Sequence, residues 1–332
     1  MKYKLLIVVP LISVLFLSFA SCRQNNFTSE GQTWGTLYHI TYDGSKNCEE
    51  AIEATLSMID NELSMFNPAS AVALVNDGTC DTVSEHFKRV FMISRRINTL
   101  SGGVYDPTVG PLSDLWGFGP HDTETEPTEE AIATALMAVG IAGCSIDSTG
   151  RLSRKSPDTV FDFSSIAKGY GIDCVADTLE ALGAQNYMIE IGGEVLACGL
   201  SPKGRPWRIQ IDSPLSGIGH KRLGVIELGP ERTAVASSGN YRNLRRRADG
   251  SLYGHTLSPI TGHPVEGRIA AATVLASDCA TADALATACM ASAEPDSALA
   301  VLARAKAEGF IVYIEGDSLY TAATSNFHMV KQ

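Results

Sequence analysis

The chain has 332 residues, 45% of them hydrophobic, and a formal net charge of −11 at pH 7. The acidic excess argues against a nucleic-acid partner, because binding to phosphates needs clustered basic side chains. After an N-terminal export segment about 300 residues remain, which is enough to bury one large core or two fused cores. No linker-like stretch divides them, so we expect one domain over residues 32–332.

The first 21 residues have the pattern of a secretory signal peptide. Lys2 and Lys4 precede an apolar run over residues 5–19, which is too short to span a bilayer comfortably. The run ends in a segment that resembles a lipobox. We therefore expect cleavage before Cys22, acylation of Cys22 and a polar tether over residues 22–31. This predicts a lipoprotein held on a membrane of the bacterial cell envelope and facing the periplasm. The alternatives are an ordinary secreted protein cut nearby and an uncleaved anchor.

Strand and helix patterns then alternate irregularly, which favours an α+β architecture over a doubly wound sheet. Apolar residues at helical spacing, with their start and stop signals, predict helices at 48–63, 87–99, 128–140 and 168–182, from 277 or 278 onward, and after Pro295. Alternating or continuous apolar runs predict strands at 37–42, 187–196, 207–211, 224–228, 234–236, 270–275, 310–314 and 319–322.

The cysteines follow no metal-binding pattern. With Cys22 acylated, seven remain, and an odd number cannot all pair within the chain. Their spacing matches no zinc site, and several lie inside apolar runs. We expect buried free thiols, with a disulfide left open as an alternative.

Two glycine- and hydroxyl-rich segments in the first half of the chain are candidate ligand sites. Residues 101–119 combine glycines, which admit a ligand to the backbone, with aromatic rings. A structural turn around a buried Trp116 would explain them equally. In residues 162–170 a strand end passes into a helix start, where backbone N–H groups and Lys168 favour phosphate, and Ser165 offers an oxygen to a hard cation. The alternative is that Asp162 or Ser164 only caps the helix.

Two further segments carry a histidine and an aspartate. His255 precedes a proline turn, where an imidazole can serve as a general base near neutral pH, although a lone histidine is more often structural. His263 has a weaker claim, since it lies within a Gly-X-Pro turn. Asp283 and Thr287 are four residues apart on an apolar helix, so their oxygens share one face. A buried aspartate needs a partner, and Mg2+ suits this pair. A hydrogen bond between the two residues is the alternative.

In their order and content these segments resemble the FAD:protein FMN transferase family, also called the ApbE family, from about residue 32 to 325. The matching motifs are Trp34-Gly35-Thr36, Leu63-Ser64-Met65-Phe66 with Ser70, Tyr105-Asp106-Pro107-Thr108, Trp116-Gly117-Phe118-Gly119, Ile166-Ala167-Lys168-Gly169-Tyr170, Ile191-Gly192-Gly193, Ser238-Gly239, His255, Thr261-Gly262 with Pro264, and Ala282-Asp283 with Thr287. The chain differs from the family pattern at Trp34, where methionine is usual, at Phe66, where tyrosine is usual, and at Ser258, which replaces an aspartate.

The resemblance implies an α+β ApbE-like fold, with antiparallel sheets, packed helices and an FAD cleft. It also implies a Mg2+-dependent reaction in which a Ser or Thr hydroxyl of a target protein attacks the FMN phosphorus of FAD and AMP leaves. By matching positions, His255 would be the base, and Ser165, Asp283 and Thr287 would hold Mg2+. The residues lining FAD would be Trp34, Phe66, Val104, Tyr105, Asp106, Asp162, Lys168 and Thr256. The acceptor would be a membrane redox subunit.

Three other functions use some of the same features. A Mg2+-dependent FAD pyrophosphatase would let water attack at the same site. A non-catalytic flavin-binding lipoprotein would bind FAD without turnover. A general solute-binding lipoprotein is disfavoured by the pairing of Asp283 with Thr287.

Overall fold

A computed structural model describes residues 25–121, 123, 125–214, 222–239, 244–246 and 250–330. Its centre is an eight-stranded sheet in the order β1-β2-β5-β6-β9-β12-β13-β14, in which every neighbouring pair is antiparallel. The strands are β1 (Asn25–Thr33), β2 (Thr36–Gly44), β5 (Tyr187–Ile191), β6 (Glu194–Cys198), β9 (Thr233–Gly239), β12 (Ile269–Ala276), β13 (Glu308–Glu315) and β14 (Ser318–Ala323). The expected α+β class with an antiparallel sheet is confirmed.

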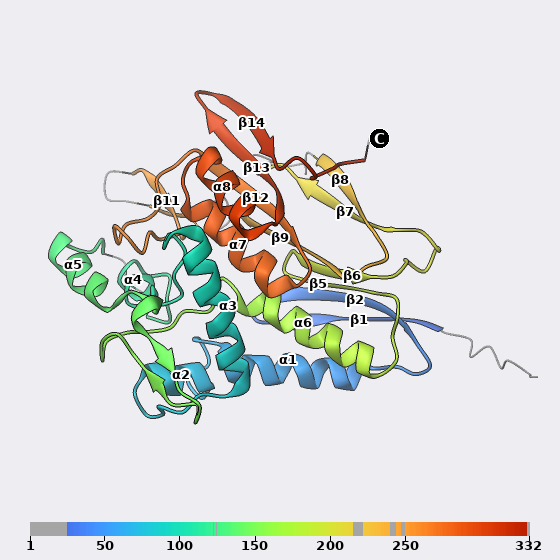
Figure 1. Ribbon diagram of the computed structural model, residues 1–332, viewed down its shortest axis with the longest axis horizontal. Coiled ribbons are helices and arrows are strands. Elements are labelled where there is room, and N and C mark those ends of the chain that lie inside the picture. Colours follow the sequence, from blue (N-terminus) through green and yellow to red (C-terminus); the bar gives the residue numbers. More distant parts are fainter. Residues whose placement is uncertain are drawn as a thin grey trace, which may run out of the picture.

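Helices cover one face of this sheet (Figure 1). They are α1 (Glu49–Leu63), α3 (Glu85–Ser101), α6 (Ala167–Ala181), α7 (Cys279–Ala291) and α8 (Pro295–Ala305). Helix α6 packs against β5 and β6, and α7 packs against β9 and β12. The apolar stripe predicted for the first helix is buried, with Ile52, Leu56, Ile59 and Leu63 each at most 4% exposed. The main core therefore lies between these helices and the sheet.

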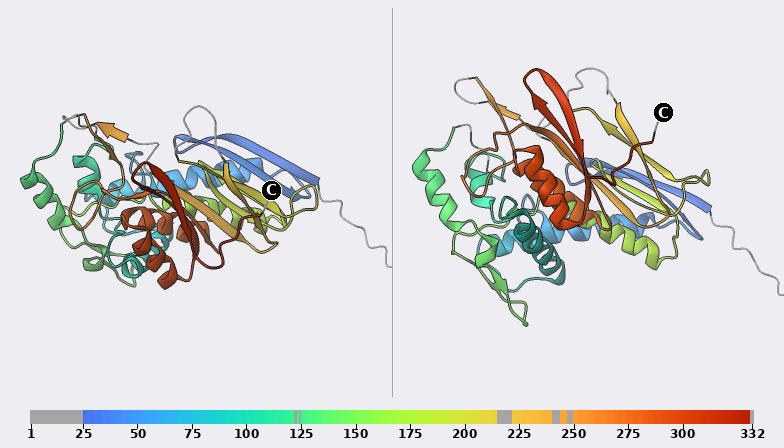
Figure 2. Two further views of the ribbon diagram at one scale, coloured as in Figure 1. Left: turned by 90° about the horizontal axis from the view of Figure 1, so that it is seen from above. Right: turned by 45° about the horizontal axis from the view of Figure 1, so that its top comes forward.

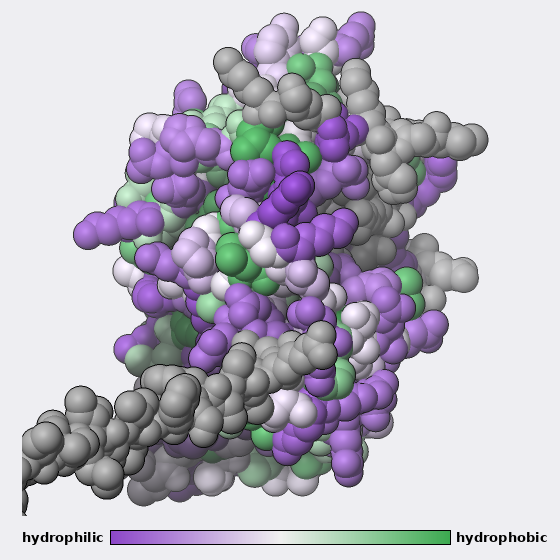
Figure 3. All heavy atoms as spheres, turned by 90° about the vertical axis from the view of Figure 1, so that its right-hand side faces the viewer, coloured by the Kyte–Doolittle hydropathy of each residue, from purple (hydrophilic) through white to green (hydrophobic). Residues whose placement is uncertain are grey.

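A hairpin covers part of the opposite face of the sheet. It consists of β7 (Trp207–Asp212) and β8 (Arg222–Leu228), which pair antiparallel. A second apolar cluster lies beneath it and includes Trp207, Phe310 and Phe327. Figure 3 shows the molecule from the side that is at the right of Figure 1, where hydrophilic residues predominate and apolar residues are scattered.

A smaller lobe lies at the other end of the molecule from this hairpin (Figure 2). It contains α4 (Gly110–Leu115), α5 (Glu129–Ala138), β10 (Leu244–Arg246) and β11 (Leu252–Gly254). Its core is built around Trp116, which packs with Leu112, Ile132 and Leu257. The Trp116 Nε1 donates a hydrogen bond to the Gly262 carbonyl at 2.8 Å, which ties the 101–119 segment to the 253–264 segment.

The remaining elements are short and were not predicted. They are α2 (Ala71–Asn76), the 3-10 turn Ile141–Gly143, β3 (Ser145–Ile146) and β4 (Leu152–Ser153). Two longer predictions need correction. Residues 25–31 were assigned to a tether but belong to β1, which pairs with β2 over its whole length. The run 187–196 is two strands, because Gly192 and Gly193, with φ of +63° and +105°, reverse the chain between β5 and β6.

Several expectations concern cysteines and the membrane. Cys22 and the signal peptide lie outside the described residues. The seven other cysteines are free thiols, of which Cys48, Cys144, Cys279 and Cys289 are buried. Across the described ranges, no helix combines the length and the apolar character needed to cross a bilayer.

Helices α6 and α7 approach each other closely at Gly169. A Cβ atom built on Gly169 would lie 2.3 Å from the carbonyl oxygen of Cys279 and 2.9 Å from the Ala280 nitrogen. Both neighbours are backbone atoms, so neither can move without moving α7. Only glycine therefore permits this approach of the two helices.

We predict that Gly169→Ala lowers the free energy of unfolding by about 1–3 kcal/mol, the usual cost of overpacking, despite the higher helix propensity of alanine. Urea denaturation of the mature chain measures this change. Gly229→Ala is the matched control, since a Cβ there meets nothing within 4 Å. Equal stability of the two variants would show that α6 and α7 can separate at little cost.

Candidate functional site

Two adjoining cavities lie at the start of α6, and the first is also lined by residues of α7. Their volumes are about 580 Å³ and about 610 Å³, within the range of small-molecule sites. Phe66, Ser164 and Lys168 line both, so one elongated ligand can occupy the two together. The first cavity brings together predicted residues from across the chain, namely Phe66, Val104, Tyr105, Asp106, Asp162, Ser165, Lys168, His255, Thr256, Asp283 and Thr287. Trp34 lines the second cavity.

Asp283 is buried on the second turn of α7 and faces the first cavity. Its Oδ2 accepts a hydrogen bond from the Gly169 amide at 3.0 Å, and its Oδ1 lies 4.0 Å from Lys168 Nζ. Burial raises the pKa of Asp283, and the Lys168 ammonium and the Gly169 N–H oppose that rise. One carboxylate oxygen is therefore held by the backbone, and the other faces the lysine.

A second buried carboxylate, Glu194, was not predicted as a site residue. Its Oε1 lies 3.0 Å from Lys168 Nζ, while its Oε2 has no hydrogen-bond partner among the described residues. Burial raises the pKa of Glu194 to about 7, and the Lys168 ammonium opposes this shift. When Glu194 and Asp283 are both ionised, the single ammonium leaves one negative charge uncompensated. This charge favours a bound cation or hydrogen-bond donor.

The only sequence signal near Glu194 is the glycine pair before it. Gly192 and Gly193 adopt positive φ and start β6 at Glu194, so the turn fixes where its side chain enters the cavity. A glutamate that follows a turn is usually solvated, and nothing local indicates that it is buried. Only the packing of β6 beside α6 makes it part of the site.

The oxygens around Asp283 suit a hard cation. Thr287 Oγ1 lies one turn further along α7, 3.4 Å from Ser238 Oγ, and Ser165 Oγ donates to the buried Tyr105 hydroxyl at 3.3 Å. The alternative bond between Asp283 and Thr287 does not form. Within the described part of the chain, no three His, Cys, Asp or Glu side chains gather as metal ligands would. A cation here would therefore use hydroxyl and backbone oxygens and the phosphates of its ligand, as Mg2+ commonly does.

Asp106 lines the same cavity, but its carboxylate is fully used within the chain. Oδ1 accepts bonds from the Thr108 N–H at 2.9 Å and the Thr108 hydroxyl at 2.6 Å. Oδ2 accepts from the Ile141 N–H at 2.9 Å and from Asn98 Nδ2 at 3.1 Å. Asp106 thus fixes the loop that presents Val104 to the cavity.

The start of α6 is not capped by either residue that the capping alternative named. Asp162 accepts from the Ser164 N–H at 2.9 Å and from Ser113 Oγ at 2.8 Å, while the N-cap position of the helix is Ile166. The side chain that accepts from the first turn of α6 is Asp283, which comes from α7. The helix start therefore needs a partner more than a hundred residues away in the sequence.

His255 lines the first cavity from the loop after β11. Its ring is exposed and lies edge-on to Phe118, with 6.3 Å between the ring centroids. Ser258 Oγ accepts the N–H groups of Ile260 at 3.3 Å and Thr261 at 3.1 Å. Ser258 therefore closes the turn that follows His255, and a carboxylate at this position could accept the same two bonds. His263 instead lies 3.4 Å from a Glu129 oxygen and does not line either cavity.

The second cavity has an aromatic wall that the backbone holds in place. Trp34 has a φ of +49°, in the left-handed region that non-glycine residues rarely adopt. Its Nε1 donates to the Leu56 carbonyl at 3.3 Å, and its ring fills the space where a Cβ on Gly171 would be. Phe66, which is 62% exposed, lies where the two cavities meet. Strained backbone of this kind is found at ligand sites.

Comparisons with known proteins identify the family and the fold of the chain. The model of the ApbE family matches residues 34–313. The FAD:protein FMN transferase of Haemophilus influenzae is 36% identical over 328 residues, covering 94% of each chain. That of Vibrio cholerae is 36% identical over 297 residues, covering 86% of this chain and 87% of the relative. The structure of the flavin transferase ApbE from Vibrio cholerae has a TM-score of 0.82 at 34% identity, covering 92% of this chain and 98% of that one.

Matches in sequence and in structure thus extend over most of the chain. They confirm the family and the fold that the motifs predicted. The chain therefore belongs to the ApbE family, and its curated relatives are enzymes named for transferring FMN from FAD to protein.

Proposed function

We propose that this protein transfers FMN from FAD to a Ser or Thr hydroxyl of another protein and releases AMP. The observation that carries the proposal is the convergence of Lys168, His255 and Asp283 on one cavity. These residues supply a positive charge, a base and a cation ligand, which are the groups that phosphoryl transfer requires. The names of the relatives support the same reaction.

In this reaction the acceptor oxygen forms a bond to the FMN phosphorus, and the bond from that phosphorus to the AMP oxygen breaks. His255 accepts the hydroxyl proton as the oxygen attacks, since its exposed ring can reach an incoming protein side chain. Lys168 offsets negative charge on the pyrophosphate. Trp34 and Phe66 hold the planar parts of FAD, and the protein contributes mainly position and charge.

Mg2+ fits the oxygens of Asp283, Thr287 and Ser165, of which Asp283 is buried and the two hydroxyls are partly buried, beside one lysine that two carboxylates share. When bound there it would neutralise charge on the pyrophosphate. Asp283 would be its charged ligand through Oδ1, because Oδ2 is held by the Gly169 N–H. Glu194 would keep the Lys168 ammonium beside the cation site.

We predict that Asp283→Asn abolishes Mg2+-dependent transfer, with a loss of about a hundredfold or more, because the amide brings no charge to the cation. Asparagine can still accept the Gly169 N–H, so the fold should persist. Transfer is measured over a Mg2+ titration, and Mg2+ affinity is measured by calorimetry. Asp317→Asn, which removes an exposed carboxylate, is the control. Wild-type activity of Asp283→Asn at low Mg2+ would remove Asp283 from the metal site.

We also predict that His255→Ala slows single-turnover transfer by about a hundred- to ten-thousand-fold, with FAD affinity nearly unchanged. The defect should persist at saturating FAD, because the variant lacks a proton acceptor and not a binding contact. His263→Ala is the matched control, since it removes a nearby imidazole that does not line the cavities. A defect that is recovered by more FAD would make His255 a pocket residue.

An assay with and without an acceptor protein distinguishes the proposed transferase from a pyrophosphatase and from a non-catalytic flavin-binding protein. Mixing the protein with FAD, Mg2+ and a candidate membrane redox subunit should release AMP and leave flavin fluorescence on the acceptor band. Free FMN and AMP without an acceptor would indicate a pyrophosphatase. Flavin binding without AMP release would indicate a non-catalytic flavin-binding protein.

We further propose that the protein is a lipoprotein, cleaved before Cys22 and anchored facing the periplasm; the lipobox-like sequence supports this. Cys22→Ala should leave the protein unprocessed or release it from the membrane fraction, while transfer by the soluble domain persists. Detergent partitioning and mass measurement check this. Cys80→Ala, at another free thiol, is the control. Normal processing and membrane retention of Cys22→Ala would rule out the lipid anchor.

A further inference from the structure

The first turns of α6 and α7 bind each other through two equivalent contacts. In one, the Gly169 amide of α6 donates to Asp283 of α7 at 3.0 Å. In the other, the Cys279 and Ala280 amides of α7 donate to the two carboxylate oxygens of Asp173, on α6, at 2.9 Å each. Asp173 lies four residues after Gly169 on α6, and Asp283 lies four residues after Cys279 and three after Ala280 on α7. Each helix N-terminus is therefore capped by an aspartate one turn inside the other helix.

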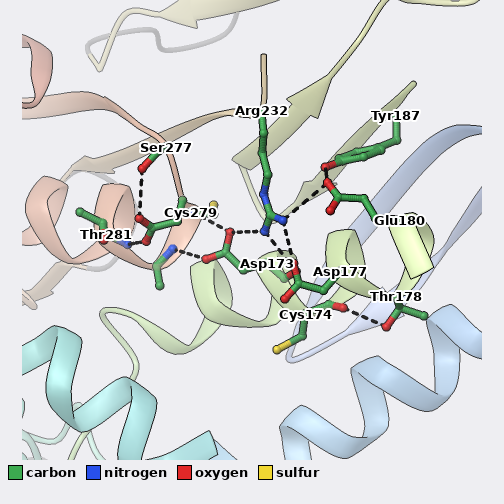
Figure 4. Close-up of polar contacts among 12 residues, drawn as sticks. Asp173, Cys174, Asp177, Thr178, Glu180, Tyr187, Arg232, Ser277, Cys279 and Thr281 are labelled. Carbon is green, nitrogen blue, oxygen red and sulfur yellow. Dashed lines mark hydrogen bonds and ion pairs between the residues drawn. The ribbon is translucent and has the colours of Figure 1, made fainter. Parts of the chain in front are cut away.

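The two aspartates differ in what surrounds them. Asp283 faces the cavity and the Lys168 ammonium, whereas Asp173 faces Arg232 (Figure 4). Arg232 Nη2 lies 3.3 Å from Asp173 Oδ1, and Arg232 Nη1 lies 2.7 Å from Asp177 Oδ1. Asp173 does not line either cavity. It is thus a buried carboxylate with a complete set of partners and no contact with the ligand site.

Arg232 ties this contact to the sheet. It precedes β9, and its guanidinium reaches Asp173, Asp177 and Glu180, all on α6. Burial raises the pKa of Asp173 to about 6, and the two α7 amides and Arg232 oppose the rise. A buried carboxylate of this kind is costly to leave unpaired, which makes its geometry strict.

The geometry at Gly169 makes the two contacts dependent on each other. The helices approach so closely there that no Cβ fits between Gly169 and the Cys279 carbonyl. A shift of α7 away from Asp173 therefore also moves Asp283 relative to the Gly169 amide. This amide holds Asp283 Oδ2 and so sets where Oδ1 points.

We propose that Asp173 is a positioning residue for Asp283: by holding the first turn of α7 against α6, it keeps the Asp283–Gly169 bond formed and the free oxygen of Asp283 directed at the cation site. This inference rests on the proposed function only where the cation is concerned. The claim that Asp173 maintains the bond between Asp283 and Gly169 does not depend on the cation. It follows from the hydrogen bonds alone.

The test compares Asp173→Asn with Asp177→Asn in the mature, flavin-free chain. Asparagine at 173 removes the charge and one of the two acceptors for α7. Asparagine at 177 weakens a contact of the same Arg232, and within the described residues Asp177 makes no hydrogen bond or ion pair with α7. Hydrogen exchange is followed at the Gly169, Cys279 and Ala280 amides, with amides of β5 as the reference for global stability. Mn2+ and Mg2+ affinities are measured by calorimetry.

We expect Asp173→Asn to speed exchange of the Gly169 amide as well as the two α7 amides by about tenfold or more, with β5 unchanged. Divalent cation affinity should fall about tenfold, and Asp177→Asn should change neither quantity. If Asp173→Asn does not fold, Arg232→Gln provides the second variant, with a smaller change in the same direction. Faster exchange at Cys279 and Ala280 with an unchanged Gly169 amide would overturn the proposal. A wild-type chain that binds no divalent cation would instead refute the metal site, and the exchange result would still decide the role of Asp173.

Discussion

The contact between the first turns of α6 and α7 determines where the chemical groups of this protein lie. Lys168 and Ser165 lie at the start of α6, and Asp283 and Thr287 lie on α7. The two helices approach each other closely at Gly169. This contact places the groups from the start of α6 and those of α7 around one cavity. Gly169 of α6 and Cys279 and Ala280 of α7 donate their N–H groups to an aspartate of the other helix, while Asp278 caps Thr281 within α7. The same bonds thus stabilise the fold and build half of the site.

The electrostatics of the site follow from this arrangement. Two buried carboxylates, Asp283 and Glu194, flank one ammonium, and their raised pKa values report how poorly water solvates them. A protein rarely keeps such an arrangement unless a ligand completes it. Glu194 Oε2 has no hydrogen-bond partner among the described residues, and few protein oxygens surround Asp283. A nucleotide and its cation would supply the missing partners.

Local sequence patterns predicted the longer helices and most strands well, because the apolar spacing of these elements is buried as expected, whereas the short helices α2 and α4 were missed. The first helix was predicted at 48–63 and lies at Glu49–Leu63. Patterns failed where tertiary pairing decides the structure. Strand β1 has no alternating apolar residues and is a strand because β2 pairs with it. The motifs also identified residues that line the first cavity. They could not show that hydrogen bonds from within the protein occupy the Asp106 carboxylate. Nothing in the sequence beside Asp173 or Glu194 indicates that these carboxylates are buried, because the segments that bury them are distant in the sequence.

The order of the strands has a consequence for how the protein is made. Strands follow one another across the sheet in sequence order, so the N-terminal strands can pair as the chain emerges during synthesis. The two halves of the site, however, are separated by the whole region between α6 and α7. A nascent chain that has not yet reached α7 lacks Asp283 and Thr287 and also leaves the start of α6 uncapped. The site is therefore complete only after α7 has been synthesised and has packed against α6.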